Sequence, residues 1–147
     1  MTDQELVGVA QAEAANAYAP YSNFHVGAAA LLRDGRVVTG VNVENASYPL
    51  GICAERCALS RAVAEGVRPG DVEVVAITAS PCGGCRQWLA EFRVDRVVCG
   101  LSETIATLSP ARAFTRVDFP TFGRPATATT PDLTRRTNPG GARPGGG

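Results

Sequence analysis

Apolar residues recur at two different spacings along the first two thirds of the chain, and the two patterns alternate. Spacings of three and four residues, which place apolar side chains on one face of a helix, predict helices at residues 3–18, 53–64 and 86–92. Shorter and more continuous apolar runs predict strands at residues 24–32, 37–43, 72–78 and 94–99. A weaker pattern at residues 101–108 is compatible with a short helix.

The order of these elements predicts an α/β domain. Arg33-Asp34-Gly35-Arg36 contains the Asp-Gly pair of a tight hairpin, so the first two strands should pair antiparallel. The later strands are joined through helices, which favours parallel pairing. The run at residues 72–78 is almost entirely apolar, as in a central strand covered on both faces. We therefore expect a three-layer α-β-α sandwich with a mixed sheet of about five strands.

The last part of the chain differs in composition from the rest. Residues 120–147 contain half of the ten prolines, end in three glycines and include few apolar side chains. Such a segment cannot bury enough apolar surface to offset the entropy of ordering it. We expect one domain at residues 1–119, followed by a disordered tail at residues 120–147.

Composition and charge favour a soluble protein that acts on a small molecule. Apolar residues make up 45% of the 147-residue chain, and its 14 basic and 14 acidic side chains cancel. Nucleic-acid binding would favour a basic excess, so no nucleic-acid partner is expected. Residues 1–11 do not resemble a signal peptide, and no apolar run reaches the ~18 residues of a membrane span. We expect a cytoplasmic protein whose five cysteines stay reduced.

Three cysteines and one glutamate stand where two of the predicted helices begin. Cys53 and Glu55 open one helix, and Cys82 and Cys85 open the other. The partial positive charge and free amides of a helix N-terminus stabilise a thiolate, which is the form that binds zinc. Three protein ligands leave a fourth position for water, whose pKa zinc lowers towards ~7. The pattern therefore indicates a catalytic zinc site in which Glu55 moves protons and the following residue, Arg56, offsets the excess negative charge.

Other interpretations of the cysteines remain open at this stage. The pair Cys82-x-x-Cys85 alone is also typical of a redox dithiol or of half a structural zinc site. Cys57, one helical turn into the first of these helices, could be a fourth ligand that closes the site. Cys99 follows apolar residues and is expected in the core, and a structural role is expected for His25, the single histidine.

The residues resemble those of a known family. Cys53-Ala54-Glu55 together with Pro81-Cys82-Gly83-Gly84-Cys85 is similar to the signature of zinc nucleoside deaminases. The segments at residues 42–48 and 21–27 resemble those of the small, homotetrameric, three-cysteine cytidine deaminases. The resemblance extends over residues 6–92. A looser similarity at residues 108–114 suggests that Phe114 is an aromatic residue that closes the site.

This resemblance implies a role for each matching residue. Cys53, Cys82 and Cys85 would hold one zinc ion per subunit, and Glu55 would be the proton shuttle. The residues implied to bind substrate are Phe24 beside the pyrimidine, Asn42 and Glu44 at the ribose hydroxyls, the backbone of Ala54 and Ser80 at the base and leaving amine, and Ala46 and Tyr48 in a neighbouring subunit's site. The functional assembly would then be a homotetramer.

The implied reaction is hydrolysis of cytidine or 2′-deoxycytidine to uridine or 2′-deoxyuridine and ammonia, as in pyrimidine salvage. A deaminase of a cytosine-containing antibiotic such as blasticidin S would use the same site and is the alternative substrate class. A structural zinc module and a dithiol oxidoreductase are the alternatives from other classes. The neutral charge and the three-cysteine ligand set argue against a polynucleotide substrate.

Overall fold

The computed structural model describes residues 1–101 and 104–108 of the chain. The predicted domain boundary at residue 119, the predicted tail at residues 120–147 and Phe114 lie outside these described residues. Within them, no helix has the length and apolar character needed to cross a bilayer.

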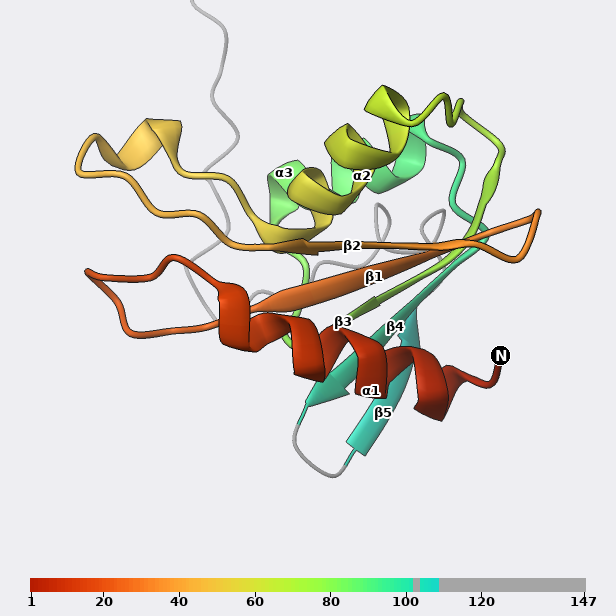
Figure 1. Cartoon of the computed structure of the whole chain (residues 1–147), viewed down its shortest axis with the longest axis horizontal. Helices are drawn as coiled ribbons and strands as arrows, with labels where there is room; N and C mark the ends of the chain where they lie inside the picture. Colours follow the sequence, from red (N-terminus) through yellow and green to blue (C-terminus); the bar gives the residue numbers. More distant parts are fainter. Residues whose placement is uncertain (102–103, 109–147) are drawn as a thin grey trace, which may run out of the picture. The chain divides into compact units, whose positions relative to one another are not determined.

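Helices and strands alternate largely as the apolar pattern predicts (Figure 1). The helices are α1 (Asp3–Glu13), α2 (Ala54–Ala64) and α3 (Gly83–Glu91), with 3-10 turns at Ala14–Asn16 and Tyr48–Leu50. The strands are β1 (Gly27–Leu32), β2 (Val37–Val41), β3 (Val72–Ile77), β4 (Arg96–Leu101) and β5 (Thr104–Leu108). Helix α1 begins at a capping box in which Thr2 and Glu5 each bind the other's backbone N–H, which satisfies two donors that the helix leaves unpaired.

The five strands form one mixed sheet in the order β2-β1-β3-β4-β5. Strand β1 pairs antiparallel with both β2 and β3, β3 pairs parallel with β4, and β4 pairs antiparallel with β5. The predicted α/β class and five-stranded mixed sheet are therefore confirmed. The short helix considered at residues 101–108 is wrong, because Thr104–Leu108 is the edge strand β5, in keeping with the β-branched residues of this segment.

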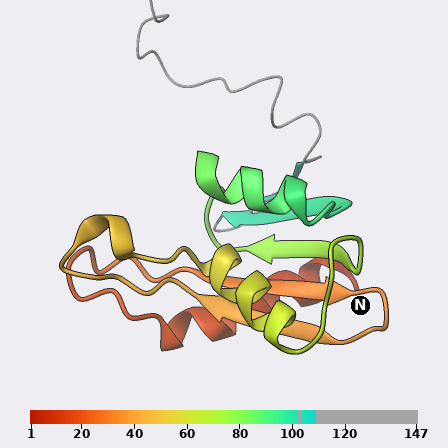
Figure 2. The ribbon, with the colours of Figure 1, turned by 90° about the horizontal axis from the view of Figure 1, so that it is seen from above.

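Helices cover both faces of the sheet and complete the three layers. Figure 1 shows α1 on one face and α2 with α3 on the other. Figure 2, from above, shows α2 lying over β1 and β2, and α3 lying near β4. The core on the α1 side consists of Leu6, Val7, Ala10, Ala29, Val74, Ala76 and Val98. The larger core beneath α2 and α3 includes Leu59, Ala62, Val75, Ile77, Leu89 and Val97.

Small residues bring α2 unusually close to β2. A Cβ atom at Gly40 of β2 would lie 2.2 Å from the backbone nitrogen of Ala58 and 2.6 Å from the carbonyl oxygen of Ala54. Ala54 and Ala58 are themselves fully buried on the sheet-facing side of α2. A glycine facing two alanines therefore sets the height of α2 above the sheet, and with it the position of the residues at the start of that helix.

Two element boundaries differ from the sequence prediction in ways that matter for the site. Helix α3 begins at Gly83 rather than at residue 86, because the Cys82 sulfur caps it by accepting a hydrogen bond from the Cys85 amide at 3.5 Å. Strand β1 begins at Gly27 rather than at residue 24. The backbone at residues 24–26 instead binds the side chain of Asn42, which accepts from the Val26 amide and donates to the Phe24 carbonyl.

Candidate metal and catalytic site

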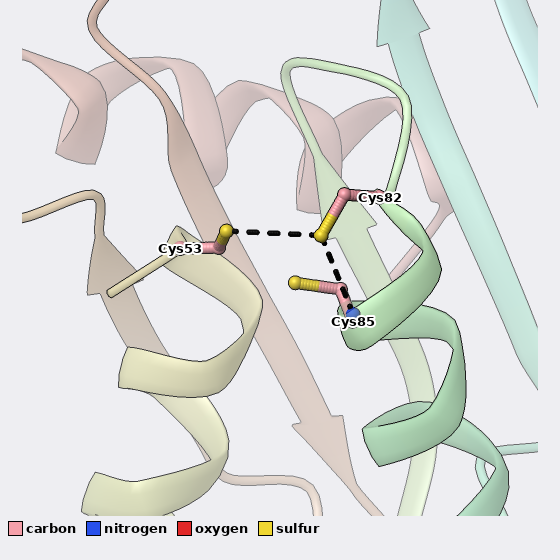
Figure 3. Close-up of side chains that lie close together, drawn as sticks. All are labelled: Cys53, Cys82 and Cys85. Atoms are coloured by element: carbon pink, nitrogen blue, oxygen red, sulfur yellow. Dashed lines mark hydrogen bonds between the residues drawn. The ribbon is translucent and has the colours of Figure 1, made fainter. Parts of the chain in front are cut away.

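Three cysteine sulfurs from two helix N-termini meet at one point (Figure 3). Cys53 is the N-cap residue of α2, Cys82 is the N-cap residue of α3, and Cys85 lies in the first turn of α3. The three Sγ atoms all lie within 4.8 Å of one another, and those of Cys53 and Cys82 are 3.9 Å apart. The structure thus brings together the three thiols that the sequence predicts as ligands.

The cluster fits a zinc ion. Sulfurs bound to one tetrahedral zinc at about 2.3 Å lie roughly 3.8 Å apart, close to the Cys53–Cys82 separation. Thiolates are the ligands that zinc prefers over harder cations. Within the described part of the chain, Cys57 is not a member of the cluster, so three protein sulfurs and not four surround the point. This argues against the closed, four-cysteine structural site.

The surroundings shift the pKa values of the two α3 thiols in opposite directions. Burial opposes ionisation of Cys82, but hydrogen bonds from the Cys85 amide, from the Cys85 thiol and from Cys53 outweigh it, so the pKa of Cys82 is lowered. Burial and the nearby Glu55 carboxylate raise the pKa of Cys85, so this thiol ionises readily only when a cation compensates the charge.

Arg56 supplies a positive charge beside the sulfurs. Its Nη2 donates to the Cys53 sulfur at 3.4 Å. The Arg56 Nε is buried and has no partner among the described residues. The guanidinium interacts with the charges of Cys53 and Cys85, where negative charge must accumulate when three thiolates bind a dication. The guanidinium therefore suits a thiolate site better than a cluster of neutral thiols.

Glu55 is the one buried charged side chain among the residues that the structure describes, with 2% of its surface exposed. It lies in the first turn of α2, two residues after Cys53. Burial raises the pKa of its carboxyl group, and hydrogen bonds from its own backbone N–H and from Cys85, with the charge of Arg56, offset the rise only in part. A buried carboxyl beside an open ligand cluster can exchange protons with a molecule bound there.

A cavity of ≈ 780 Å³ opens over the sulfurs and Glu55. All the residues that the resemblance implies for substrate binding line it: Phe24, Asn42, Glu44, Ala46, Tyr48, Ala54 and Ser80. Cys53, Cys82, Glu55 and Arg56 line it too, whereas the third ligand candidate, Cys85, is buried behind them. One cavity thus contains both the residues expected to bind substrate and the exposed side of the thiol cluster.

Asn42 and Glu44 follow β2 and line this cavity, and both bind the segment at residues 21–26. Asn42 binds backbone groups of Phe24 and Val26 at 2.9 and 2.8 Å. The Glu44 carboxylate accepts from the Tyr21 and Ser22 amides at 2.9 and 3.2 Å and from the Ser22 hydroxyl. The hydrogen bond from that hydroxyl, together with the one from the Tyr21 amide, lowers the pKa of Glu44 and keeps it ionised.

Sequence reasoning missed several residues of the cavity wall, including Tyr21, Ile52 and Ala79. It also missed the contact between Ser22 and Glu44, which lie 22 residues apart. A local signal for Ser22 existed, because serine side chains often accept the amide two residues on, as Ser22 does from Phe24 at 3.0 Å. Cys99 is buried in β4 as expected. His25 is exposed, and its Nδ1 lies 3.3 Å from the Asn23 carbonyl oxygen.

Comparisons with known proteins agree with this geometry. The model of the family described as cytidine and deoxycytidylate deaminase zinc-binding region matches residues 1–101. The chain is 50% identical over 98 residues to the cytidine deaminase of Halalkalibacterium halodurans, covering 63% of this chain and 73% of that protein. It is 46% identical over 107 residues to a probable cytidine deaminase of Dictyostelium discoideum, covering 67% and 73%. The crystal structure of cytidine deaminase from Burkholderia pseudomallei aligns with a TM-score of 0.73 at 43% identity, covering 76% of this chain and 95% of that one.

Proposed function

Because the chain belongs to the cytidine and deoxycytidylate deaminase family, we propose that it hydrolyses cytidine and 2′-deoxycytidine to uridine and 2′-deoxyuridine with release of ammonia. The observation that carries this proposal is the joining of three sulfurs and a buried glutamate in one cavity with the polar pair Asn42 and Glu44. The ligands are Cys53, Cys82 and Cys85, with one zinc ion per chain. When bound, the ion lowers the pKa of a water towards ~7 and so supplies a nucleophile at neutral pH.

Glu55 carries the protons of the reaction. An oxygen atom from water forms a bond to C4 of the pyrimidine, and the bond from C4 to the exocyclic amine breaks. The Glu55 carboxylate takes one proton from the attacking water and delivers it to ring nitrogen N3. It then takes the remaining proton from the new C4 hydroxyl and hands it to the departing amine, which leaves as ammonia. Its burial beside the ligand cluster keeps bulk water from taking over this transfer.

The cavity walls orient the nucleoside. Phe24 flanks the pyrimidine ring, and backbone groups of Ala54 and Ser80 bind the base and the departing amine. Asn42 and Glu44 bind the ribose hydroxyls. Asn42 retains one free N–H and one free lone pair after its two backbone contacts, which suits a hydroxyl that both donates and accepts.

The charges of the cavity favour a nucleoside over a nucleotide. Of the described residues that line it, three carry charge: Glu44, Glu55 and Arg56. Arg56 already binds the Cys53 sulfur, which leaves two acids to face a substrate. A 5′-phosphate brings about two negative charges and would need a cation to replace its hydration. We therefore favour cytidine over deoxycytidylate. Because Asn42 and Glu44 suit sugar hydroxyls, we also favour the nucleoside over an antibiotic such as blasticidin S.

We further propose that the active form is a homotetramer in which Ala46 and Tyr48 reach a neighbouring copy's site. Tyr48 lies at the cavity rim and is 94% exposed in the single chain, and Leu50 beside it is 66% exposed. Large apolar side chains exposed in this way favour contact with another protein surface. Specific activity should fall on dilution as copies separate, whereas a monomer with full activity would contradict this assembly. Because thiolate ligands must stay reduced, we expect the enzyme to act in the cytoplasm, in pyrimidine salvage.

An ultraviolet assay of the purified protein tests the proposed activity directly. Cytidine should be converted, turnover should stop after treatment with a zinc chelator, and added zinc should restore it. Deoxycytidylate and blasticidin S, assayed beside cytidine at equal concentration, should be converted much more slowly. No conversion of cytidine by the zinc-loaded protein would refute the proposal, and faster conversion of either competitor would replace the substrate assignment.

A further inference from the structure

The hydroxyl group of Ser22 joins two residues that are expected to contact different parts of a nucleoside. It donates to Oε1 of Glu44 and accepts the backbone N–H of Phe24 at 3.0 Å. The backbone N–H of Ser22 donates to Oε2 of Glu44 at 3.2 Å, beside the Tyr21 amide at 2.9 Å. Ser22 thus contacts Glu44 through both its side chain and its backbone. Ser22, Phe24 and Glu44 all line the cavity.

The direction of each hydrogen bond is fixed by the chemistry of the groups. An amide N–H can only donate, and an ionised carboxylate can only accept. The Ser22 hydroxyl must therefore accept from Phe24 and point its single hydrogen at Glu44. Glu44 is the one acceptor for that hydrogen among the contacts described. This hydrogen bond on Oε1, together with the two amide hydrogen bonds on Oε2, fixes the orientation of the carboxylate about its terminal C–C bond.

Counting the acceptor positions shows what remains for a ligand. A carboxylate offers about four lone-pair positions, two on each oxygen. In the described contacts, Oε2 of Glu44 accepts two amides and Oε1 accepts the Ser22 hydroxyl. One position therefore remains, and it lies on Oε1, the oxygen that Ser22 binds. Glu44 can therefore accept a hydrogen bond from one ligand hydroxyl, but not from two hydroxyls at once.

We propose that Ser22 is a positioning residue for sugar recognition, whose hydroxyl orients Glu44 so that its one remaining acceptor position meets a single sugar hydroxyl. This inference rests on the proposed nucleoside substrate.

The surrounding segment does not depend on this hydroxyl for its fold. Asn42 separately binds Phe24 and Val26, and the Asn23 amide donates to the Ala19 carbonyl at 3.0 Å. The Tyr21 and Ser22 amides would still bind Oε2 in a Ser22→Ala variant. Removal of the hydroxyl should therefore release Oε1 without unfolding the segment at residues 21–26.

The test compares a ligand that carries the 2′- and 3′-hydroxyls of the sugar with one that lacks both. Dissociation constants of uridine and 2′,3′-dideoxyuridine, which carry no amine to hydrolyse, are measured by calorimetry for the zinc-loaded wild type and for Ser22→Ala, Ser22→Thr and Ser60→Ala. Ser60 is an exposed serine on α2 away from the cavity wall and serves as the matched control. Ser22→Ala should weaken uridine binding about tenfold, the effect of one misplaced hydrogen bond to a charged group, and leave dideoxyuridine binding unchanged. Ser22→Thr, which keeps a hydroxyl, and Ser60→Ala should retain the wild-type preference for uridine.

Four results would overturn the inference. A purely structural role would weaken both ligands equally in Ser22→Ala. A wild type that binds both ligands equally would show that neither the 2′- nor the 3′-hydroxyl is recognised. Cytidine turnover by the wild type, measured on the same preparation, distinguishes failure of the role of Ser22 from failure of the proposed function. A wild type that deaminates cytidine while Ser22→Ala keeps the full preference for uridine refutes the role of Ser22 alone, whereas an inactive wild type refutes the proposed function and this inference with it.

Discussion

Replacing Gly40 by alanine should push helix α2 away from the sheet and disturb the thiol cluster at its start. The added methyl group would lie 2.2 Å from the Ala58 nitrogen and 2.6 Å from the Ala54 carbonyl oxygen. Both obstructing atoms belong to the backbone of α2, so no side chain can rotate to make room. The helix that moves carries Cys53, Glu55 and Arg56 in its first turn or at its cap.

The size of the effect follows from these distances. Ordinary van der Waals contact begins near 3.4 Å, so α2 and β2 must separate by roughly 1 Å. Overfilling a packed core typically lowers the free energy of unfolding by about 1–3 kcal/mol. Because the atoms in the way belong to the helix backbone, we expect a loss near the upper end, about 3 kcal/mol. A displacement of that size is also a large fraction of a zinc–sulfur bond, so the cluster should bind zinc less well.

Two measurements check this prediction. Urea unfolding of the zinc-free protein, followed by circular dichroism, should show a clearly lower midpoint for Gly40→Ala, and the purified variant should hold less than one zinc ion per chain. Gly8→Ala is the matched control, because Gly8 lies on the exposed face of α1 with no atom within 4 Å of an added Cβ. Alanine there should stabilise the helix by about 1 kcal/mol and leave zinc unchanged. A Gly40→Ala protein with the wild-type midpoint and full zinc content would refute the idea that this contact positions α2.

Three further substitutions test other parts of the account. Cys57→Ala should retain zinc and cytidine turnover, because Cys57 lies outside the sulfur cluster, and loss of bound zinc on metal analysis would revive the closed four-cysteine site. Arg56→Gln should release zinc at a lower chelator concentration than the wild type, because it removes the positive charge from the Cys53 sulfur, and an unchanged chelator titration would contradict that role. Thr2→Ala should lower the free energy of unfolding by about 1 kcal/mol through loss of the α1 cap, with no change in zinc content, as measured by urea unfolding.

The elements that the sequence predicted well are those whose signal is local. Burial on both faces of β3 was readable because Val72–Ile77 is apolar at every position except Glu73. The thiols were readable because Cys53 and Cys82 precede apolar helical patterns, and a cap position directs a side chain towards the helix axis. That both caps contribute to one site was inferred from the thiols at the two helix starts and then from the family resemblance. The fold explains it, because α2 packs on β1 and β2, and β3, the neighbour of β1, leads into α3.

What the sequence did not reveal depends on contacts between distant segments. The segment at residues 24–26 has the apolar character of a strand, but Asn42 binds its backbone and delays β1 until Gly27. The strand β5 was ambiguous because a five-residue run shows no clear period, and pairing with β4 decides its conformation. No pattern within either segment predicts that the Glu44 carboxylate binds Ser22. The two residues are 22 positions apart in the sequence, and only the tertiary structure brings them into contact.

The zinc content and cytidine turnover of Glu55→Gln, measured beside the wild type, test whether three sulfurs hold the metal while Glu55 carries the protons. Glutamine keeps the size and polarity of the buried side chain but cannot carry a proton, and Glu55 is not one of the three clustered ligand candidates. The variant should hold one zinc ion per chain, bind uridine as the wild type does, and lose cytidine turnover by about 10³-fold or more. Full turnover in a zinc-loaded Glu55→Gln protein, or loss of zinc together with the carboxylate, would contradict the assignment of three sulfurs as the metal site and Glu55 as the proton carrier.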